Sequence, residues 1–184
     1  ALIDYHADYT AYFSRHEARY QGRKTMLDPA PRVILVPGLG LFGVGASKAE
    51  ARIAADLAET NIDVIAAAET MDTYEVIPEP DIFDIEYWSL EQAKLGKAVE
   101  RPLARRIAVI TGGGSGIGAA TAAAFRAEGA EVAVLDLDTN AAAAVAKPLG
   151  GLFVGCDVTD QKAVEHAFGR VAEVYGGVDI VVSN

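Results

Sequence analysis

Hydrophobic residues in the second half of the chain recur with two different periods. Short runs rich in apolar, β-branched residues predict strands, and the segments between them carry apolar residues at helical spacing. The strands are predicted at residues 106–111, 131–136, 152–156 and 178–183, and the helices at residues 116–128, 140–147 and 159–175. This alternation predicts a parallel, doubly wound α/β sheet with right-handed crossovers and the strand order 3-2-1-4.

The first half of the chain shows mainly helical spacing. Aromatic residues three and four positions apart predict an amphipathic helix over residues 4–20, and a β-branched run predicts a strand at residues 32–36. A glycine-rich turn follows, and a capping box at residues 47–50 opens a long helix. A further helix is predicted over residues 83–97. We therefore expect a mostly helical α+β segment.

A linker separates the two halves. Residues 96–106 combine charged residues with Pro102 and show no sustained period. We place the boundary near Pro102, so that residues 1–100 and 101–184 are expected to form two domains. The chain begins with Ala1 rather than methionine, and its last strand stops without a polar tail. We therefore expect a fragment of a longer protein, truncated after the fourth strand.

The composition excludes several classes of protein. Hydrophobic residues make up 51% of the chain and charged residues 23%, which is typical of a globular chain rather than a disordered one. The 26 acidic and 16 basic residues give a net charge of −10, which disfavours nucleic acid as a partner. No apolar run approaches the roughly 18 residues of a membrane span, so we expect no membrane partner. Because Cys156 is the single cysteine and no signal peptide opens the chain, we expect a cytoplasmic protein.

A glycine-rich stretch, Thr-Gly-Gly-Gly-Ser-Gly-Ile-Gly over residues 111–118, lies where a predicted strand gives way to a helix. In such a turn Gly112 permits the tight bend, Gly116 lets the backbone approach a pyrophosphate and Gly118 lets the helix pack close to the strand. The helix start offers backbone N–H groups and the positive end of its dipole to phosphates. A turn without a ligand is the alternative interpretation of the stretch taken alone.

Asp136 supports the dinucleotide interpretation. It ends the next predicted strand, 24 positions after Gly112, where a carboxylate can accept hydrogen bonds from the adenosine ribose hydroxyls. A role as a helix N-cap or turn residue is the alternative. Asp136, with Asp138 close by, would repel the 2′-phosphate of NADP, and no Arg or Lys lies in residues 112–118 or beside Asp136. We therefore predict NAD(H) as the cofactor.

Three separated motifs resemble those of the short-chain dehydrogenase/reductase family. Residues 111–118 resemble its Thr-Gly-x-x-x-Gly-x-Gly signature, and Cys-Asp-Val-Thr at residues 156–159 resembles its Asp-Val pair, whose Asp meets the adenine amino group. Val-Val-Ser-Asn at residues 181–184 resembles the start of its Asn-Asn-Ala-Gly motif, with serine in place of the first Asn. The resemblance covers residues 105–184 and implies a Rossmann-type sheet and an NAD-dependent oxidoreductase.

The predicted cofactor site combines the glycine turn with the residues that follow the other strands. Its members are Thr111, Gly112, Ser115, Gly116, Ile117, Gly118, Asp136, Leu137, Asp157, Val158 and Asn184. In the family, a Ser and a Tyr-x-x-x-Lys pair beyond the fourth strand carry the catalysis, so we predict no catalytic residue in this chain. Tyr20-Gln-Gly-Arg-Lys24 matches the spacing, but Gly22 interrupts the helix, and we interpret this string as a surface helix end.

A second glycine-rich string, Gly-Leu-Gly-Leu-Phe-Gly at residues 38–43, also follows a predicted strand. Its apolar residues favour a packed, hairpin-like turn over a phosphate site. The three histidines show no metal-ligand spacing, so we predict no metal site in this chain.

Residues 37–95 resemble the region that precedes the dehydrogenase in bifunctional rhamnulose-1-phosphate aldolase/short-chain dehydrogenase proteins. The resemblance rests mainly on Glu-Tyr-Trp-Ser-Leu-Glu-Gln-Ala-Lys at residues 86–94. It implies the C-terminal part of a zinc-dependent class II aldolase, with the zinc ligands outside this chain. It also implies a dehydrogenase that acts on lactaldehyde or a similar small alcohol or aldehyde.

Two alternatives stay open from the sequence. The chain can be a non-catalytic nucleotide-binding module, or residues 1–100 can be an assembly element that joins subunits. The fourth strand is an apolar edge in the predicted order, and exposed edges recruit other strands. We therefore expect a homo-oligomer, or coverage of this strand by part of residues 1–100.

Overall fold

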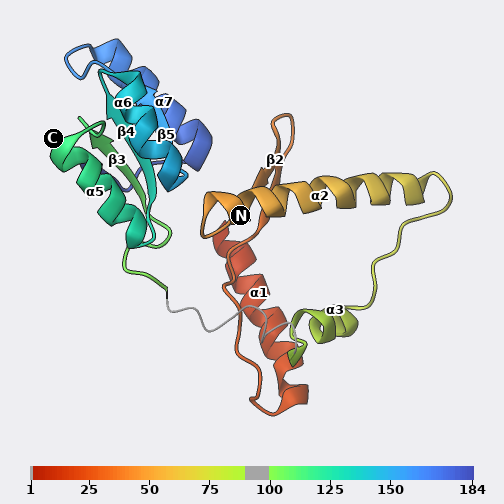
Figure 1. The fold of residues 1–184 in the computed structure, drawn as a ribbon. Coiled ribbons are helices and arrows are strands. Elements are labelled where there is room, and N and C mark those ends of the chain that lie inside the picture. Colours follow the sequence, from red (N-terminus) through yellow and green to blue (C-terminus); the bar gives the residue numbers. More distant parts are fainter. Residues whose placement is uncertain (1, 90–99) are drawn as a thin grey trace. The chain divides into compact units, whose positions relative to one another are not determined.

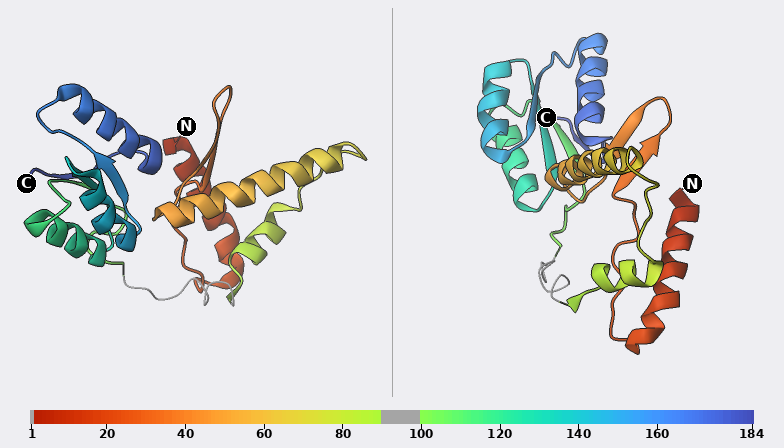
Figure 2. Two further views of the ribbon diagram at one scale, coloured as in Figure 1. Left: turned by 45° about the horizontal axis from the view of Figure 1, so that its top comes forward. Right: turned by 90° about the vertical axis from the view of Figure 1, so that its right-hand side faces the viewer.

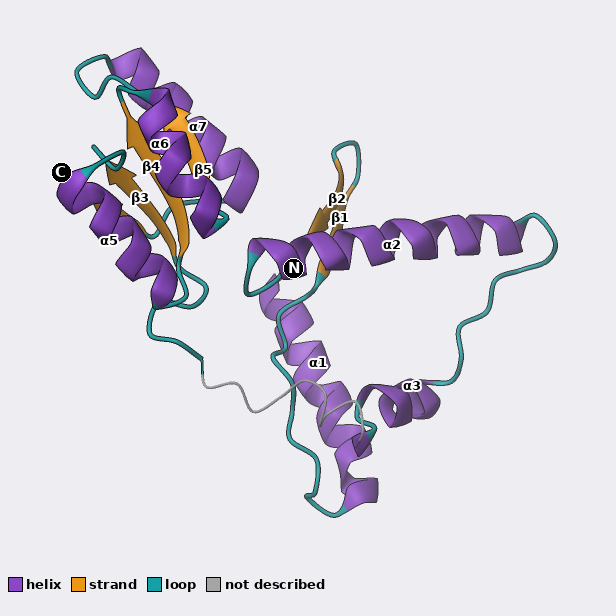
Figure 3. Ribbon diagram, viewed as in Figure 1, coloured by secondary structure: helices purple, strands orange, loops and turns teal. Residues whose placement is uncertain are grey.

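The computed structural model describes residues 2–89 and 100–184 (Figure 1). They form two compact units, the first within residues 2–45 and 49–89 and the second within residues 46–48 and 100–184. Each unit has its own helices and strands, which Figure 3 distinguishes by colour. None of the described helices is long and apolar enough to cross a membrane.

The second unit is built around a four-stranded sheet. Its strands are β3 (Ile107–Thr111), β4 (Glu131–Asp136), β5 (Leu152–Gly155) and β6 (Ile180–Val182). All neighbours are parallel, and they lie in the order β5-β4-β3-β6, which is the predicted 3-2-1-4 order counted along this unit. The prediction of a doubly wound, Rossmann-type sheet is therefore confirmed.

Helices join consecutive strands of this sheet and cover both of its faces. They are α5 (Gly116–Ala127), α6 (Thr139–Ala146), which continues as the 3-10 turn η2 (Lys147–Leu149), and α7 (Gln161–Tyr175). The right-hand view of Figure 2 shows α5 and α6 on one side of the sheet and α7 on the other. The unit is therefore a three-layer α/β/α arrangement.

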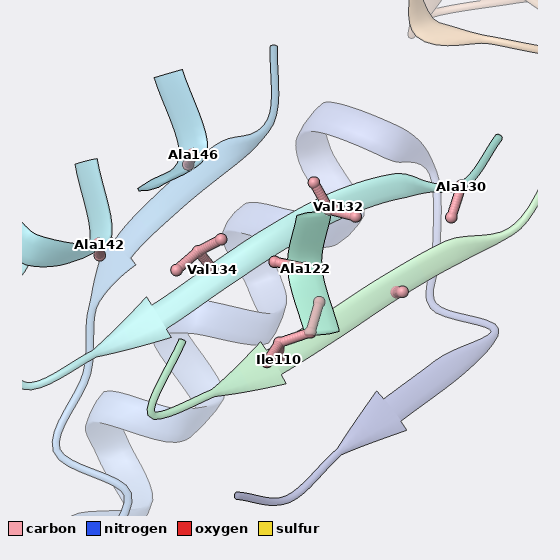
Figure 4. Packing of buried hydrophobic residues seen from close by; sticks show 8 residues of the cluster. Ile110, Ala122, Ala130, Val132, Val134, Ala142 and Ala146 are labelled. Carbon is pink, nitrogen blue, oxygen red and sulfur yellow. The ribbon is translucent and has the colours of Figure 1, made fainter. Parts of the chain in front are cut away.

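Side chains that alternate along the strands divide the interior of this unit into two cores. The core in Figure 4 brings small helix residues against branched strand residues and includes Ala122, Ala142, Ala146, Ile110, Val132 and Val134. The core on the opposite face includes Val109, Ala133, Leu135, Ala167 and Val171. Because both faces of β3 and β4 are buried, these strands have nearly continuous apolar runs, as parallel strands do.

The first unit contains two helical parts and a hairpin. α1 (Leu2–Glu17) continues as the 3-10 turn η1 (Ala18–Tyr20) and packs against α3 (Glu79–Glu86). The fully buried ring of Phe83 lies 5.9 Å from the ring of Phe13, measured between centroids. The prediction of one helix over residues 83–97 is wrong in its bounds, because α3 already begins at Glu79 and ends at Glu86, where Tyr87 leaves the helical conformation. Residues 90–97 of the predicted helix lie outside the described residues.

The hairpin of the first unit pairs β1 (Val33–Val36) with β2 (Gly40–Gly43) in antiparallel fashion. It lies against α2 (Lys48–Glu69), because a side-chain carbon added to Gly43 would be only 2.0 Å from the Ala51 carbonyl oxygen. The predicted hairpin-like structure is therefore confirmed, and the glycine-rich string supplies a strand as well as the turn.

The outer edge of β6 has no strand beside it among the described residues, since β6 pairs only with β3. Coverage of this edge, either by a second copy or by part of residues 1–100, stays a prediction.

Candidate functional site

The turn between β3 and α5 forms the centre of the candidate site, at the carboxyl edge of the sheet. Thr111 ends β3, and Ser115 is the N-cap residue of α5. Gly112 and Gly116 have φ angles of 55° and 52°, which favour glycine. The carbonyl of Ser115 accepts the N–H of Ala119 at 3.1 Å, which is the first hydrogen bond of the helix. The N–H groups of residues 116–118 therefore have no acceptor within α5. Such groups form an anion site.

Gly116 and Gly118 differ in their surroundings. Among the described residues, no heavy atom outside the adjoining backbone lies within 4 Å of the position that a Gly116 side-chain carbon would take. The same carbon on Gly118 would lie 2.3 Å from the carbonyl oxygen of Gly112. This geometry fits the roles expected from the spacing, which are close ligand approach at Gly116 and close helix packing at Gly118.

The Asp136 carboxylate lies beside this turn, at the end of β4. Its Oδ2 atom accepts the N–H of Gly114 at 2.9 Å, and its Oδ1 atom accepts the N–H of Asp138 at 3.0 Å. The side chain is thereby oriented while it stays partly exposed. Sequence reasoning missed Gly114, because its role is a backbone bond across 22 residues that no spacing rule encodes.

Asp138, and not Asp136, is the N-cap of α6. Its Oδ1 atom accepts the N–H groups of Asn140 at 2.9 Å and Ala141 at 3.2 Å. The alternative interpretation of Asp136 as a helix cap is therefore wrong. The structure assigns the two neighbouring carboxylates to different tasks, one at the cap and one at the glycine turn.

Asp157 and Val158 follow β5 at the same edge of the sheet. The Asp157 Oδ1 atom accepts the hydroxyl of Thr159 at 2.7 Å and its N–H at 2.9 Å. The hydroxyl bond, followed by the backbone bond, lowers the pKa of the Asp157 carboxyl below its usual value. The exposed side chain is therefore an ionised acceptor at neutral pH.

Thr159→Val is expected to raise the pKa of Asp157 toward the usual value for aspartate, because the largest stabilising contact of the ionised form is lost. The folded-state pKa of Asp157 is lowered, so this contact stabilises the fold above the unfolded-state pKa and is lost as the pH falls through the folded value. Carboxyl-carbon NMR titration measures the change. Thr121→Val, which removes a hydroxyl bonded within α5, is the control. An unchanged Asp157 titration in Thr159→Val would contradict the assignment.

Thr111 and Asn184 connect the ends of β3 and β6. The Thr111 hydroxyl donates to the Val182 carbonyl at 3.3 Å and accepts the N–H of Asn184 at 3.1 Å. The Asn184 side-chain amide donates to the Gly112 carbonyl at 3.3 Å. These two predicted site residues therefore position the glycine turn.

Three apolar side chains of the predicted site are exposed, with fractions of 78% for Ile117, 76% for Leu137 and 57% for Val158. One of them follows each of β3, β4 and β5. Exposed apolar side chains beside a few convergent polar groups are typical of a ligand site. The carboxyl edge of the sheet therefore has the mixed character that a nucleotide requires.

The Tyr20–Lys24 string makes hydrogen bonds within the first unit. The Tyr20 hydroxyl donates to Asp84 Oδ1 at 2.5 Å, and this bond raises the pKa of Tyr20, whereas a tyrosine base needs a lowered one. Lys24 donates to the carbonyl of Tyr87, which is a structural contact within the first unit. Across residues 2–89 and 100–184, no group of three or more His, Cys, Asp or Glu residues could hold a metal ion.

The chain matches two protein families. Residues 1–95 match the family described as Aldolase class II, second domain, and residues 106–184 match the family described as short chain dehydrogenase. The uncharacterized oxidoreductase YuxG of Bacillus subtilis (strain 168) is 37% identical over 186 residues, which cover 97% of this chain and 27% of YuxG.

Other similar proteins match the second half of the chain. The mitochondrial borneol dehydrogenase of Lavandula x intermedia is 39% identical over 90 residues, which cover 49% of this chain and 35% of that protein. The crystal structure of a 3-ketoacyl-(acyl-carrier-protein) reductase from Brucella melitensis complexed with NADH is 36% identical, with a TM-score of 0.41, and the match covers 41% of this chain and 32% of that one. The chain thus spans about a quarter to a third of the length of these proteins. Its first half belongs to the class II aldolase second-domain family, and its second half belongs to the short-chain dehydrogenase family.

Proposed function

We propose that residues 106–184 bind NAD(H) and form the cofactor-binding part of a short-chain oxidoreductase. The observation that carries this proposal is the Asp136 carboxylate at the end of β4, held beside the glycine turn by the N–H of Gly114 at 2.9 Å. The helix N–H groups, the open space at Gly116 and the exposed apolar side chains support it. A nicotinamide dinucleotide needs this combination of phosphate, ribose and ring contacts.

Each part of the site has a place in cofactor binding. The N–H groups at the start of α5 would hold the pyrophosphate, Asp136 would accept from the ribose hydroxyls, and Asp157 would accept from the adenine amino group. The bound cofactor supplies hydride-transfer chemistry. The residues of this chain bind and orient it, and we propose no catalytic residue among them.

Charge supports NAD(H) over NADP(H). Asp136 occupies the position that a ribose approaches, so a 2′-phosphate would meet a carboxylate there. Residues 112–118 contain no Arg or Lys, and neither do the residues adjacent to Asp136. The negative charge at this corner of the site is therefore not offset by a nearby cation in the sequence.

We also propose that the chain is part of a longer bifunctional protein that joins a class II aldolase to the dehydrogenase. The order of the two family matches and the similarity to YuxG across both halves support this proposal. Its substrate would be a small alcohol or aldehyde such as lactaldehyde, and we propose a cytoplasmic homo-oligomer. The base that would accept the proton of an alcohol substrate would lie outside this chain.

Fluorescence titration of the 184-residue chain with NADH and with NADPH tests the cofactor assignment. We expect NADH to bind at least about tenfold more tightly, which corresponds to about 1.4 kcal/mol of charge repulsion against NADPH. Tighter binding of NADPH would overturn the preference for NAD(H). Absence of binding for both nucleotides would overturn the nucleotide site itself.

A further inference from the structure

An apolar groove lies in the first unit between the β1–β2 hairpin and α2. Figure 3 shows the hairpin and the helix beside each other. Its volume is about 810 Å³. Large apolar side chains line both walls and include Val33, Leu35, Leu41, Ile53, Leu57 and Ile62. The exposed fractions are 63% for Leu35, 58% for Ile53 and 66% for Leu57. Contiguous apolar surface of this kind marks an interaction site.

The groove follows from how the hairpin meets the helix. At Gly43 the two backbones lie so close that an added side-chain carbon would be 2.0 Å from the Ala51 carbonyl oxygen and 3.0 Å from the Ala55 side chain. A two-stranded hairpin is marginally stable alone, and apolar faces are normally buried between layers. Within the described part of the first unit, the hairpin and α2 supply two walls, and no third element covers the groove.

The lining disfavours a small molecule and a second copy as the occupant. Only three of the 14 lining residues are polar, namely Arg32, Glu50 and Asn61, whereas small-molecule sites need polar groups that converge on the ligand. Residues 1–100 carry 17 acidic and 9 basic residues, a net charge of −8, so two copies joined through this segment would bring like charges together, and the proposed homo-oligomer would form through another surface. An apolar surface of a different protein segment therefore fits the groove better than a small molecule or a second copy does.

We infer that the groove is the docking site for the remaining part of the aldolase in the longer polypeptide. The groove lies within residues 32–65, inside the segment that matches the second domain of a class II aldolase. YuxG aligns with 97% of this chain, but the aligned region makes up only 27% of YuxG. Most of a protein of that kind is therefore outside the aligned region. The inference rests on the proposed bifunctional protein and is independent of the cofactor assignment.

Thiol labelling tests the inference on both walls of the groove. Leu57→Cys on α2 and Leu35→Cys on β1 are made in the 184-residue chain and in the longer polypeptide, and the rate of reaction with a maleimide is measured. Arg52→Cys is the control, because its side chain is on α2, is 81% exposed and does not line the groove. The native Cys156 is buried and burial raises its thiol pKa, so it reacts slowly and gives the background.

We expect the thiols introduced by Leu57→Cys and Leu35→Cys to react at least tenfold more slowly in the longer polypeptide, with Arg52→Cys unchanged. Equal rates in the two proteins would overturn the inference. Protection that already exists in the 184-residue chain and grows with its concentration would identify a second copy as the occupant and would also overturn it. The NADH titration reports on the second unit, so failure of the cofactor assignment is distinguishable from failure of the docking site.

Discussion

Gly118→Val is expected to abolish detectable NADH binding and to lower the free energy of unfolding by about 1–3 kcal/mol. The first carbon of the new side chain would lie 2.3 Å from the Gly112 carbonyl oxygen and 2.9 Å from the Gly113 Cα atom. Both are backbone atoms, so the clash is relieved only if α5 moves away from the turn. The N–H groups proposed to hold the pyrophosphate move with the helix. NADH fluorescence titration and urea unfolding measure the two effects.

Gly169→Ala is the matched control for this substitution. Gly169 lies in the middle of α7, and among the described residues no heavy atom beyond its own helix lies within 4 Å of the added carbon. Alanine in a helix interior is about 1 kcal/mol more favourable than glycine, so the control should be slightly more stable and bind NADH normally. If Gly118→Val binds NADH as tightly as the control does, close packing of the helix on the turn is not required for the site.

Asp136→Asn is expected to weaken NADH binding roughly 10- to 100-fold and to reduce the preference for NADH over NADPH. A hydrogen bond to a charged group contributes about 1.5–3 kcal/mol, and each 1.4 kcal/mol is a factor of about ten in affinity. Asparagine keeps the shape of the side chain but has one acceptor oxygen and no charge, so the Gly114 N–H and the ribose hydroxyls compete for it. Loss of the charge also removes the repulsion of a 2′-phosphate. Parallel titrations with NADH and NADPH measure both changes.

Asp138→Asn separates geometry from net charge. It removes a negative charge two residues away from Asp136, while asparagine remains a good N-cap for α6. We expect the NADH affinity of this variant to stay within about twofold of the unmodified chain. Equal losses in the Asp136 and Asp138 variants would mean that net charge, and not the placement of Asp136, determines cofactor binding.

The sheet of the second unit could be predicted from the sequence because its physical causes are local. Strands buried on both faces have continuous apolar runs, and glycines fall at the turn that follows β3. The residues of the candidate site could be named because parallel strands place their carboxyl ends at one edge. Their hydrogen-bond partners could not, since the Gly114–Asp136 bond depends on the register of β3 and β4.

In the first unit, β2 was harder to predict than β1. Residues 40–43 begin and end with glycine, which favours a turn by local preference. Their strand conformation depends on pairing with β1 and on the close contact between Gly43 and Ala51 of α2, which are tertiary effects. The apolar groove between the hairpin and α2 follows from the same contact, so it could not be predicted from the sequence pattern alone.

The position of β3 in the sheet has a consequence for synthesis on the ribosome. β3 is a central strand, but its neighbours arrive at different times, because β4 begins at Glu131 and β6 begins only at Ile180. At a translation rate of about 5–20 residues per second, the edge of β3 that will meet β6 is left open for about 4–15 s after β3 is made. A strand that is central in the finished sheet therefore has an unpaired apolar edge during synthesis, and such an edge can pair with other chains before β6 arrives.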